Sequence, residues 1–259
     1  MSELFDPRIG GVLSADIAVP EREHEMHFYS RVLTTGEIPL WREDLMNNQG
    51  APVIGLGAAS PEYRDLPLQW IPHIQVADVA ASANRVLDLG GSELIHNKDE
   101  GGHSQWAVLI DPNGAAFGLI PVVSAEAVSP IEGEVASVGR IAWLDLTVEN
   151  ADTTCDFYRE VVGWFVQNVD MKDGDEQYAD YNMLGGDGAG VAGVCHARGK
   201  NQGLPPVWLI YLPVGDLAES LRRVREEGGT VVKEASTDSQ YAYAVIQDPV
   251  GVSLGLVPG

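Results

Sequence analysis

The sequence predicts an α+β protein built from four copies of a β-α-β-β-β module, and three observations carry this prediction. Each quarter of the chain contains several strand-like runs but one helical run, whereas a parallel sheet alternates strands with helices. The stretch "DPNG" at Asp111–Gly114 recurs as "DPVG" at Asp248–Gly251. Both copies lie between two apolar runs, which is typical of a tight turn joining the last two strands of a domain.

The first half of the chain contains two such modules in order. "IGGVLSADIAV" alternates like a strand, and "PEREHEMHFYSRVL" then changes to a helical period. Short strands follow, of which "APVIGLGAA" is the clearest. "WIPHIQVAD" is the next strand, "VAASANRVLDLGG" is a helix that ends at glycines, and "SELIH", "WAVLI" and "AAFGLIP" are strands.

The second half repeats the first. "MHFYSRVL" matches "CDFYREVVGW", and "VADVAASANRVLDLGG" matches "VGDLAESLRRVREEGG". The extra residues of the second half fall near "MKDGDEQYADYNMLGGDG", which predicts a longer hairpin. We therefore predict two domains, at residues 9–121 and 138–259. They are joined by a linker at residues 122–137, which is poor in large apolar residues and contains a proline.

The composition limits the partners that the protein can have. The net charge is −22 with 16 Lys plus Arg, so the chain repels phosphate backbones and anionic lipid surfaces, and we expect neither nucleic acid nor membrane as a partner. No apolar run reaches about 18 residues, and no signal peptide is recognisable. The two cysteines, Cys155 and Cys195, form no disulfide framework, so we expect a cytoplasmic location.

The four modules, the helix-borne "FY" with "VVGW", and the closing "DPxG" strand resemble the vicinal oxygen chelate superfamily. This superfamily includes glyoxalase I, bleomycin-resistance proteins and extradiol dioxygenases. The resemblance extends from about Ile9 to Pro258. It implies two tandem glyoxalase-like domains, whose mostly antiparallel sheets curl into cups with helices outside. Because this fold also hosts isomerases, lyases and pure drug-binding proteins, the resemblance does not select one activity.

The resemblance also implies where a divalent metal would bind. Enzymes of the superfamily use a His on the first strand, a His on the strand that opens the second module, and a Glu on the strand after DPxG. Here the first position falls on Ser14 and Trp143, and the Glu position falls on Gly118 and Gly255. Such a metal needs about three protein oxygens or nitrogens, so we predict no metal and no other cofactor.

The strands that open the second module of each half carry Ile71 and Leu209 at the implied His position. His73 and Tyr211 lie one inward position further along. His73 is the leading candidate for a general base or a ligand-binding imidazole, and a satisfied, half-buried histidine is the alternative.

Asp16 and Asp145 occupy matching positions in the first strands of the two halves. Asp is depleted in strand interiors, and strand alternation turns both side chains toward the cup. They could accept hydrogen bonds from a ligand hydroxyl, amine or cation. The alternative is a structural carboxylate at the rim of the cup.

Aromatic residues complete the predicted ligand pocket. Trp143 and Tyr211 point into the cup by parity, and Trp106 and Tyr243 match each other across the repeat. Aromatic walls with few polar groups suit a flat organic ligand, although core packing explains the aromatic residues equally well. The predicted pocket residues are Ser14, Asp16, His73, Gln75, His103, Trp106, Gly118, Trp143, Asp145, Tyr211, Tyr243 and Gly255.

The sequence therefore predicts a protein that binds a small aromatic or apolar organic molecule. One alternative is a metal-independent lyase, isomerase or hydroxylase-like enzyme that uses His73 and Asp16 as acid–base groups. Another is a structural module with vestigial pockets. The sequence specifies neither ligand nor reaction, and a homodimer is one assembly that it allows.

Overall fold

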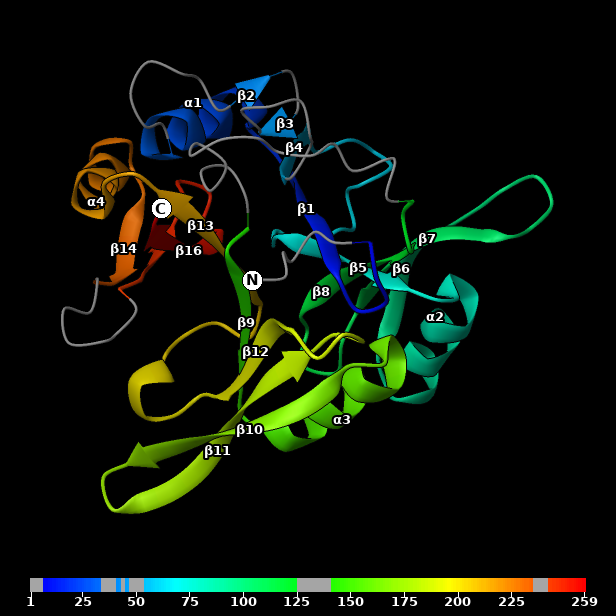
Figure 1. Ribbon diagram of the computed structural model, residues 1–259. Helices are drawn as coiled ribbons and strands as arrows, with labels where there is room; N and C mark the ends of the chain where they lie inside the picture. Colours follow the sequence, from blue (N-terminus) through cyan, green and yellow to red (C-terminus); the bar gives the residue numbers. More distant parts are fainter. Residues whose placement is uncertain (1–6, 34–40, 43–44, 47–53, 125–140, 235–241) are drawn as a thin grey trace. The chain divides into compact units, whose positions relative to one another are not determined.

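The structure is a computed structural model that describes residues 7–33, 41–42, 45–46, 54–124, 141–234 and 242–259 (Figure 1). Four modules follow one another along the chain, each with the order strand, helix and three strands. The α+β class and the four-module architecture are therefore confirmed. The linker predicted at residues 122–137 lies mostly outside the described residues, and the division at 9–121 and 138–259 stays a prediction.

The modules have the following elements. Module 1 contains β1 (Val12–Val19), α1 (Arg22–Leu33), β2 (Trp41–Arg42), β3 (Leu45–Met46) and β4 (Ile54–Ala58). Module 2 contains β5 (Ile71–Val76), α2 (Val79–Asp88), β6 (Ser92–Lys98), β7 (Ser104–Ile110) and β8 (Ala116–Pro121). Module 3 contains β9 (Trp143–Val148), α3 (Ala151–Val162), β10 (Phe165–Asp173), β11 (Glu176–Leu184) and β12 (Gly190–His196), followed by the 3-10 helix η3 (Gly199–Asn201). Module 4 contains β13 (Trp208–Val214), α4 (Leu217–Glu226), β14 (Thr230–Lys233), β15 (Ala244–Gln247) and β16 (Ser253–Pro258).

Two compact units combine modules from both halves of the chain. Unit 1 comprises the described residues within 1–13, 71–128 and 144–208, and therefore holds modules 2 and 3. Unit 2 comprises those within 14–70, 129–143 and 209–259. It therefore holds modules 1 and 4 apart from the first residues of β1 and β13, together with Trp143 of β9. Packing thus follows a different division from the sequence repeat.

The strand order is the same in every module. Unit 1 contains the orders β5-β8-β7-β6 and β10-β11-β12-β9, and unit 2 contains β2-β3-β4-β1 and β13-β16-β15-β14. In each module the first strand pairs in parallel with the last strand, and the remaining pairs are antiparallel. The predicted longer hairpin is present, because β10 and β11 pair along their whole length.

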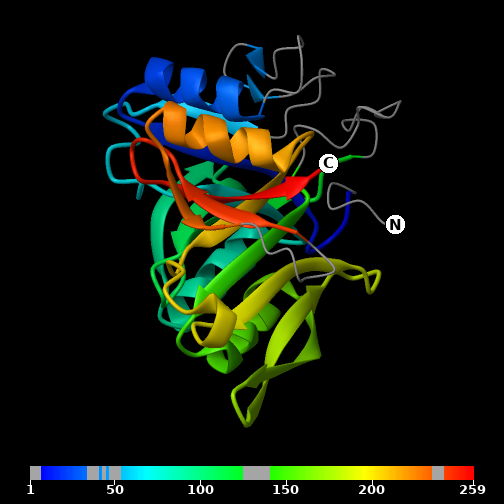
Figure 2. The ribbon, with the colours of Figure 1, turned by 90° about the vertical axis from the view of Figure 1, so that its left-hand side faces the viewer.

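The helices begin where the sequence supplies a capping side chain. Asp78 accepts a hydrogen bond from the backbone N–H of Ala81 at 2.9 Å, and Asp216 accepts the equivalent bond from Glu219 at 2.9 Å. Such caps satisfy amides that the first helical turn leaves unpaired. In unit 2, α1 and α4 lie side by side (Figure 2), and the Ser220 hydroxyl donates to the carbonyl of Val32 at 2.7 Å. None of the helices in the described residues is long and apolar enough to cross a membrane.

The repeated turn has a structural partner in the repeated "FY" motif. In unit 1, the Tyr158 hydroxyl on α3 donates to Oδ2 of Asp111 at 3.3 Å and accepts from Nε1 of Trp208 at 2.9 Å. In unit 2, the Tyr29 hydroxyl on α1 donates to Oδ2 of Asp248 at 2.7 Å. Both tyrosines are 0% exposed, so each helix is fixed to the turn of the other module in its unit.

The turns themselves have the geometry expected from their sequence. Oδ1 of Asp111 accepts from the amide N–H groups of Asn113 and Ala115, at 2.8 and 2.9 Å. Gly114 and Gly251 both have φ of +92°, a conformation that glycine adopts without a steric penalty. The carboxylate therefore closes the turn on one side and receives the tyrosine on the other.

Tyr158→Phe should test the tyrosine–turn contact in unit 1. The variant leaves the Asp111 carboxyl without one donor and the Trp208 indole without its acceptor, both in a buried site, so we expect a loss of about 1–3 kcal/mol in the free energy of unfolding. The measurement is equilibrium unfolding in urea. Tyr181→Phe is the matched control, because Tyr181 donates to Asp152 near the surface, and its change should stay within about 0.5 kcal/mol. Equal losses in the two variants would contradict the importance of the buried contact.

Candidate functional site

Each module places a first-strand side chain beside a glycine of its last strand. In every case the two residues are register partners across the parallel strand pair, and all four first-strand residues carry a polar group. The pairs are Asp16 with Gly55, His73 with Gly118, Asp145 with Gly193, and Tyr211 with Gly255. All four first-strand residues were predicted to point toward a cup.

Three of these glycines, Gly55, Gly118 and Gly255, are required by close approach. A Cβ added at Gly118 would lie 2.6 Å from Cδ2 of His73, and a Cβ at Gly255 would overlap the ring of Tyr211. A Cβ at Gly55 would overlap the carboxylate of Asp16. The first-strand side chain therefore fills the space that a larger residue at the glycine would need.

This packing bears directly on the metal site that the fold implies. The resemblance to the superfamily predicts its glutamate at Gly118 and Gly255, and in the structure the rings of His73 and Tyr211 cover these two glycines. A carboxylate could not be added at either position without moving a ring. Within the described part of the chain, no group of three or more His, Cys, Asp or Glu side chains could hold a metal ion. The residues present do not fit the superfamily's metal.

The structure distributes the predicted acid–base residues between the units. His73, half-buried, and Asp145, partly exposed, belong to unit 1, whereas Asp16, exposed, and Tyr211, which is 4% exposed, belong to unit 2. The predicted pairing of His73 with Asp16 therefore does not occur within a single unit and stays a prediction.

In unit 2, Tyr211 is part of an aromatic and cationic cluster. The ring of Tyr243 meets that of Tyr211 edge to face, with centroids 5.7 Å apart. The Lys233 ammonium lies 4.6 Å from the centroid of Tyr243 and donates to its hydroxyl. Lys233 was not among the pocket residues predicted from the sequence, and the structure places it on the half-buried side of β14.

The other predicted pocket residues have varied surroundings. Gln75 is fully buried, and its side-chain oxygen accepts from the backbone N–H of Val123 at 3.0 Å, so it fixes the segment after β8. His103 lies in an exposed loop, where its side chain is 80% exposed and contacts Asp99 at 3.1 Å. Ser14, Trp106 and Trp143 are of intermediate exposure.

The long hairpin of module 3 builds a second polar cluster that the sequence did not reveal. Nδ1 of His196 lies 3.3 Å from Oδ1 of Asp180, which also accepts from the His196 backbone N–H at 2.8 Å. The Tyr178 ring meets the imidazole edge to face, and the Arg198 guanidinium lies 4.4 Å from the centroid of that ring. Asp180 is 3% exposed, so a buried carboxylate orients the imidazole. The only sequence signal was the extra length of this hairpin.

Neither cysteine is suited to nucleophilic chemistry. Both thiols are free, and burial raises the pKa of Cys155 to about 12, with a further contribution from the charge of Asp152. Burial likewise raises the pKa of Cys195 far above its usual range. Both thiols therefore stay protonated and unreactive at physiological pH.

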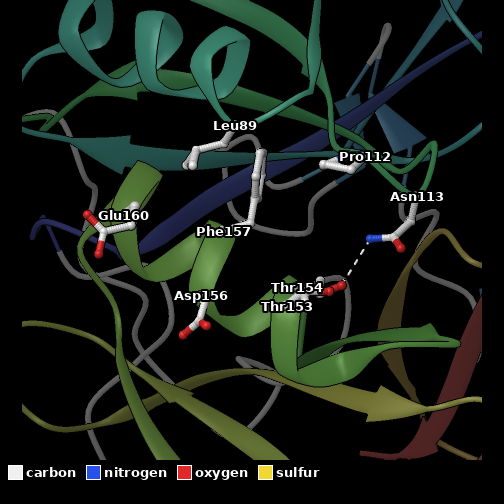
Figure 3. A pocket seen from close by; sticks show the side chains of 8 residues that line it. All are labelled: Leu89, Pro112, Asn113, Thr153, Thr154, Asp156, Phe157 and Glu160. Atoms are coloured by element: carbon white, nitrogen blue, oxygen red, sulfur yellow. Dashed lines mark hydrogen bonds between the residues drawn. The ribbon is translucent and has the colours of Figure 1, made fainter.

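A separate cavity of about 320 Å³ opens on the helical side of unit 1 (Figure 3). Phe157 points toward Leu89 and Pro112, and the Asn113 side-chain amide donates to the Thr154 hydroxyl at 3.0 Å. Its lining residues are Leu89, Pro112, Asn113, Thr153, Thr154, Asp156, Phe157 and Glu160. None of the predicted pocket residues contributes to it.

Known proteins with similar sequences and folds agree with this architecture. Among curated proteins, the chain is 27% identical over 205 residues to "Putative glyoxylase CFP32" of Mycobacterium bovis, which covers 78% of this chain and 73% of that protein. It is 26% identical over 200 residues to the anthracycline biosynthesis protein DnrV of Streptomyces peucetius, covering 76% and 68%.

The fold is also similar to that of a Mn(II)-bound glyoxalase from Novosphingobium aromaticivorans. The TM-score is 0.58 at 15% sequence identity, over 97% of this chain and 82% of the other. At this identity the likeness establishes the fold alone. Residues 140–256 match the family model described as the glyoxalase/bleomycin resistance protein/dioxygenase superfamily. Residues 140–256 are therefore a domain of that superfamily, and the chain as a whole has its vicinal oxygen chelate fold.

Proposed function

We propose that the protein binds a small aromatic or apolar organic molecule without the metal that enzymes of its superfamily use. The observation that carries this proposal is the packing of the His73 and Tyr211 rings over Gly118 and Gly255. The rings occupy the space of the metal-binding glutamates, so the same positions offer imidazole and phenol surfaces in place of carboxylates. Such surfaces favour stacking and hydrogen bonding to a planar molecule.

The surroundings of Tyr211 support a ligand that carries an acceptor group. Tyr211 and Tyr243 supply aromatic faces, and Lys233 is a cation beside them in a chain whose net charge is −22. A planar ligand could stack on the rings and direct a carbonyl, phenolate or carboxylate oxygen toward the lysine. The predicted pocket residues of both halves remain the candidate contacts.

The relatives support a role with small organic molecules. One curated relative is named a glyoxylase and another an anthracycline biosynthesis protein. We propose a cytoplasmic location, which the two free thiols support, and we retain the homodimer as the proposed assembly. The alternative is an enzyme that uses His73 and Asp16 as acid–base groups, and observed turnover of a ligand would favour it.

Metal analysis tests the metal-free proposal. Protein purified without chelators should contain well under one equivalent of Zn, Fe, Mn or Ni per chain by elemental mass spectrometry, because glycine occupies both glutamate positions. Adding these ions should also leave the melting temperature unchanged. Retention of about one ion per chain that His73→Ala releases would overturn the proposal.

Removing the Tyr211 ring tests the ligand site. A screen of aromatic metabolites and antibiotics by thermal shift should give a ligand that stabilises the wild type. Tyr211→Ala should then weaken its binding about tenfold or more, as measured by calorimetry, because one stacking face is lost. Phe165→Ala is the matched control, since this aromatic side chain is 61% exposed and belongs to unit 1.

Two outcomes would decide against the proposal. Equal weakening in both variants would remove Tyr211 from the site, and an absence of any hit would favour a structural module with vestigial pockets. If a hit were converted to product, and His73→Ala abolished turnover while binding survived, the enzyme alternative would be correct.

A further inference from the structure

Glu25 is a carboxyl buried in an unusual place. It lies on the core-facing side of α1, one helical turn before Tyr29, and it is 0% exposed. Neither of its carboxyl oxygens has a hydrogen-bond partner within the described residues. An ionised carboxylate in such a place would carry a large desolvation cost, so the group is poised to hold a proton.

Asp248 of the DPVG turn is an acidic neighbour of Glu25, since the two carboxyls interact and Asp248 is also bonded to Tyr29, one helical turn after Glu25. Asp248 is 3% exposed and accepts hydrogen bonds from the Tyr29 hydroxyl at 2.7 Å and from the amide of Val252 at 2.7 Å. Its carboxylate is therefore stabilised by donors, whereas that of Glu25 is not. A proton placed on Glu25 gives it a donor toward Asp248.

The other charged groups around α1 do not compensate Glu25. Glu21, just before α1, adds negative charge, and on α1 itself Nδ1 of His24 lies 3.5 Å from Oε1 of Glu25, but the His24 side chain is 52% exposed. Arg22 donates to the carbonyl of Leu56 on β4. At the end of α4, the capping residue Glu227 contacts His27 at 3.2 Å and Arg31 at 3.1 Å, and Arg223 of α4 donates to the carbonyl of Arg31.

Unit 1 shows the same architecture with a neutral group. Thr154 stands at the position of Glu25 in α3, where its hydroxyl donates to the carbonyl of Asn150 at 2.9 Å and accepts from Asn113 at 3.0 Å. Asn113 belongs to the DPNG turn, and Val250 replaces it in unit 2. Where unit 1 has the neutral, hydrogen-bonded pair Thr154 and Asn113, unit 2 has Glu25 and Val250, so that a second carboxyl lies near the turn aspartate.

We propose that Glu25 and Asp248 form a proton-binding switch in unit 2, in which one shared proton holds α1 against the DPVG turn. Loss of this proton places two carboxylates in one buried site, and their repulsion loosens the contact. The turn leads directly into β16, which carries Gly255 beneath the Tyr211 ring. The switch therefore acts on the strand that supports the aromatic cluster of unit 2.

The direction of the pH dependence follows from the burial of Glu25. Burial first, and then the charge of Asp248, raises the pKa of Glu25 from 4.5 to about 8. Between these values the folded protein holds a proton that the unfolded chain has released. The contribution of Glu25 to stability is therefore fully present below about pH 4.5 and is lost as the pH rises toward about 8, and over that range the group makes the unfolding constant increase up to about tenfold per pH unit.

Glu25→Gln tests the switch by removing the titration while keeping the shape. Unfolding in urea is measured from about pH 5.5 to about pH 7.5. We expect the variant to lack the wild type's loss of about one proton on unfolding and to be the more stable protein at the upper end. Glu23→Gln, an exposed carboxyl on the same helix, is the control and should keep the wild-type slope. Identical slopes in wild type and Glu25→Gln would overturn the proposal.

Two further measurements test the switch even if Glu25→Gln fails to fold. Glu25→Thr copies the group found in unit 1 and should also abolish the slope. In the wild type, the infrared carbonyl band of a buried protonated carboxylic acid should be present at about pH 6 and absent at about pH 9. A wild-type band that is missing at about pH 6 would mean that Glu25 is ionised in the folded state, and the switch would not exist.

Discussion

The hydrogen bond between a buried tyrosine and the aspartate of a DPxG turn is the contact on which the rest of the structure depends. It joins Tyr158 to Asp111 in unit 1 and Tyr29 to Asp248 in unit 2. In each case the tyrosine comes from one half of the chain and the turn from the other. The bond satisfies two polar groups that would otherwise be costly to bury, and it sets which helix faces which hairpin. The recurrence of both motifs in the sequence reflects this requirement.

A second constraint links the strands that carry the candidate site. His73 and Tyr211 lie over Gly118 and Gly255, so the residue at the glycine position and the size of the neighbouring side chain depend on each other. A chain that kept a metal-binding glutamate would need a smaller or displaced neighbour. Glycine at these two positions and the rings beside them therefore depend on each other. This coupling explains how the fold can keep its strand pairing while its chemistry changes.

The sequence predicted the fold well because the signals for the fold are local. Alternation, helical period, glycine stops and the DPxG turns specify each element within a few residues. The composition of the two units could not be predicted, because the partner of Tyr29 is far away in the chain. Lys233, Asp180 and His196 were not predicted as site residues, because each forms its cluster through contacts with residues outside its own strand. Glu25 resembled an ordinary polar helix residue, and only its burial distinguishes it.

The interleaved composition of the units has a consequence for how the chain acquires its structure. Module 1 packs with module 4. Tyr29 on α1 can therefore form its hydrogen bond only after Asp248, in the last hairpin of the chain, has been synthesised. Contacts of such long sequence separation slow the folding of a domain. Modules 2 and 3 are neighbours in the chain, so their contacts close shorter loops than those between modules 1 and 4. The same exchange between halves is what two separate copies of an ancestral half-chain would make on dimerising, so fusion of the two copies would have turned an intermolecular interface into an intramolecular core.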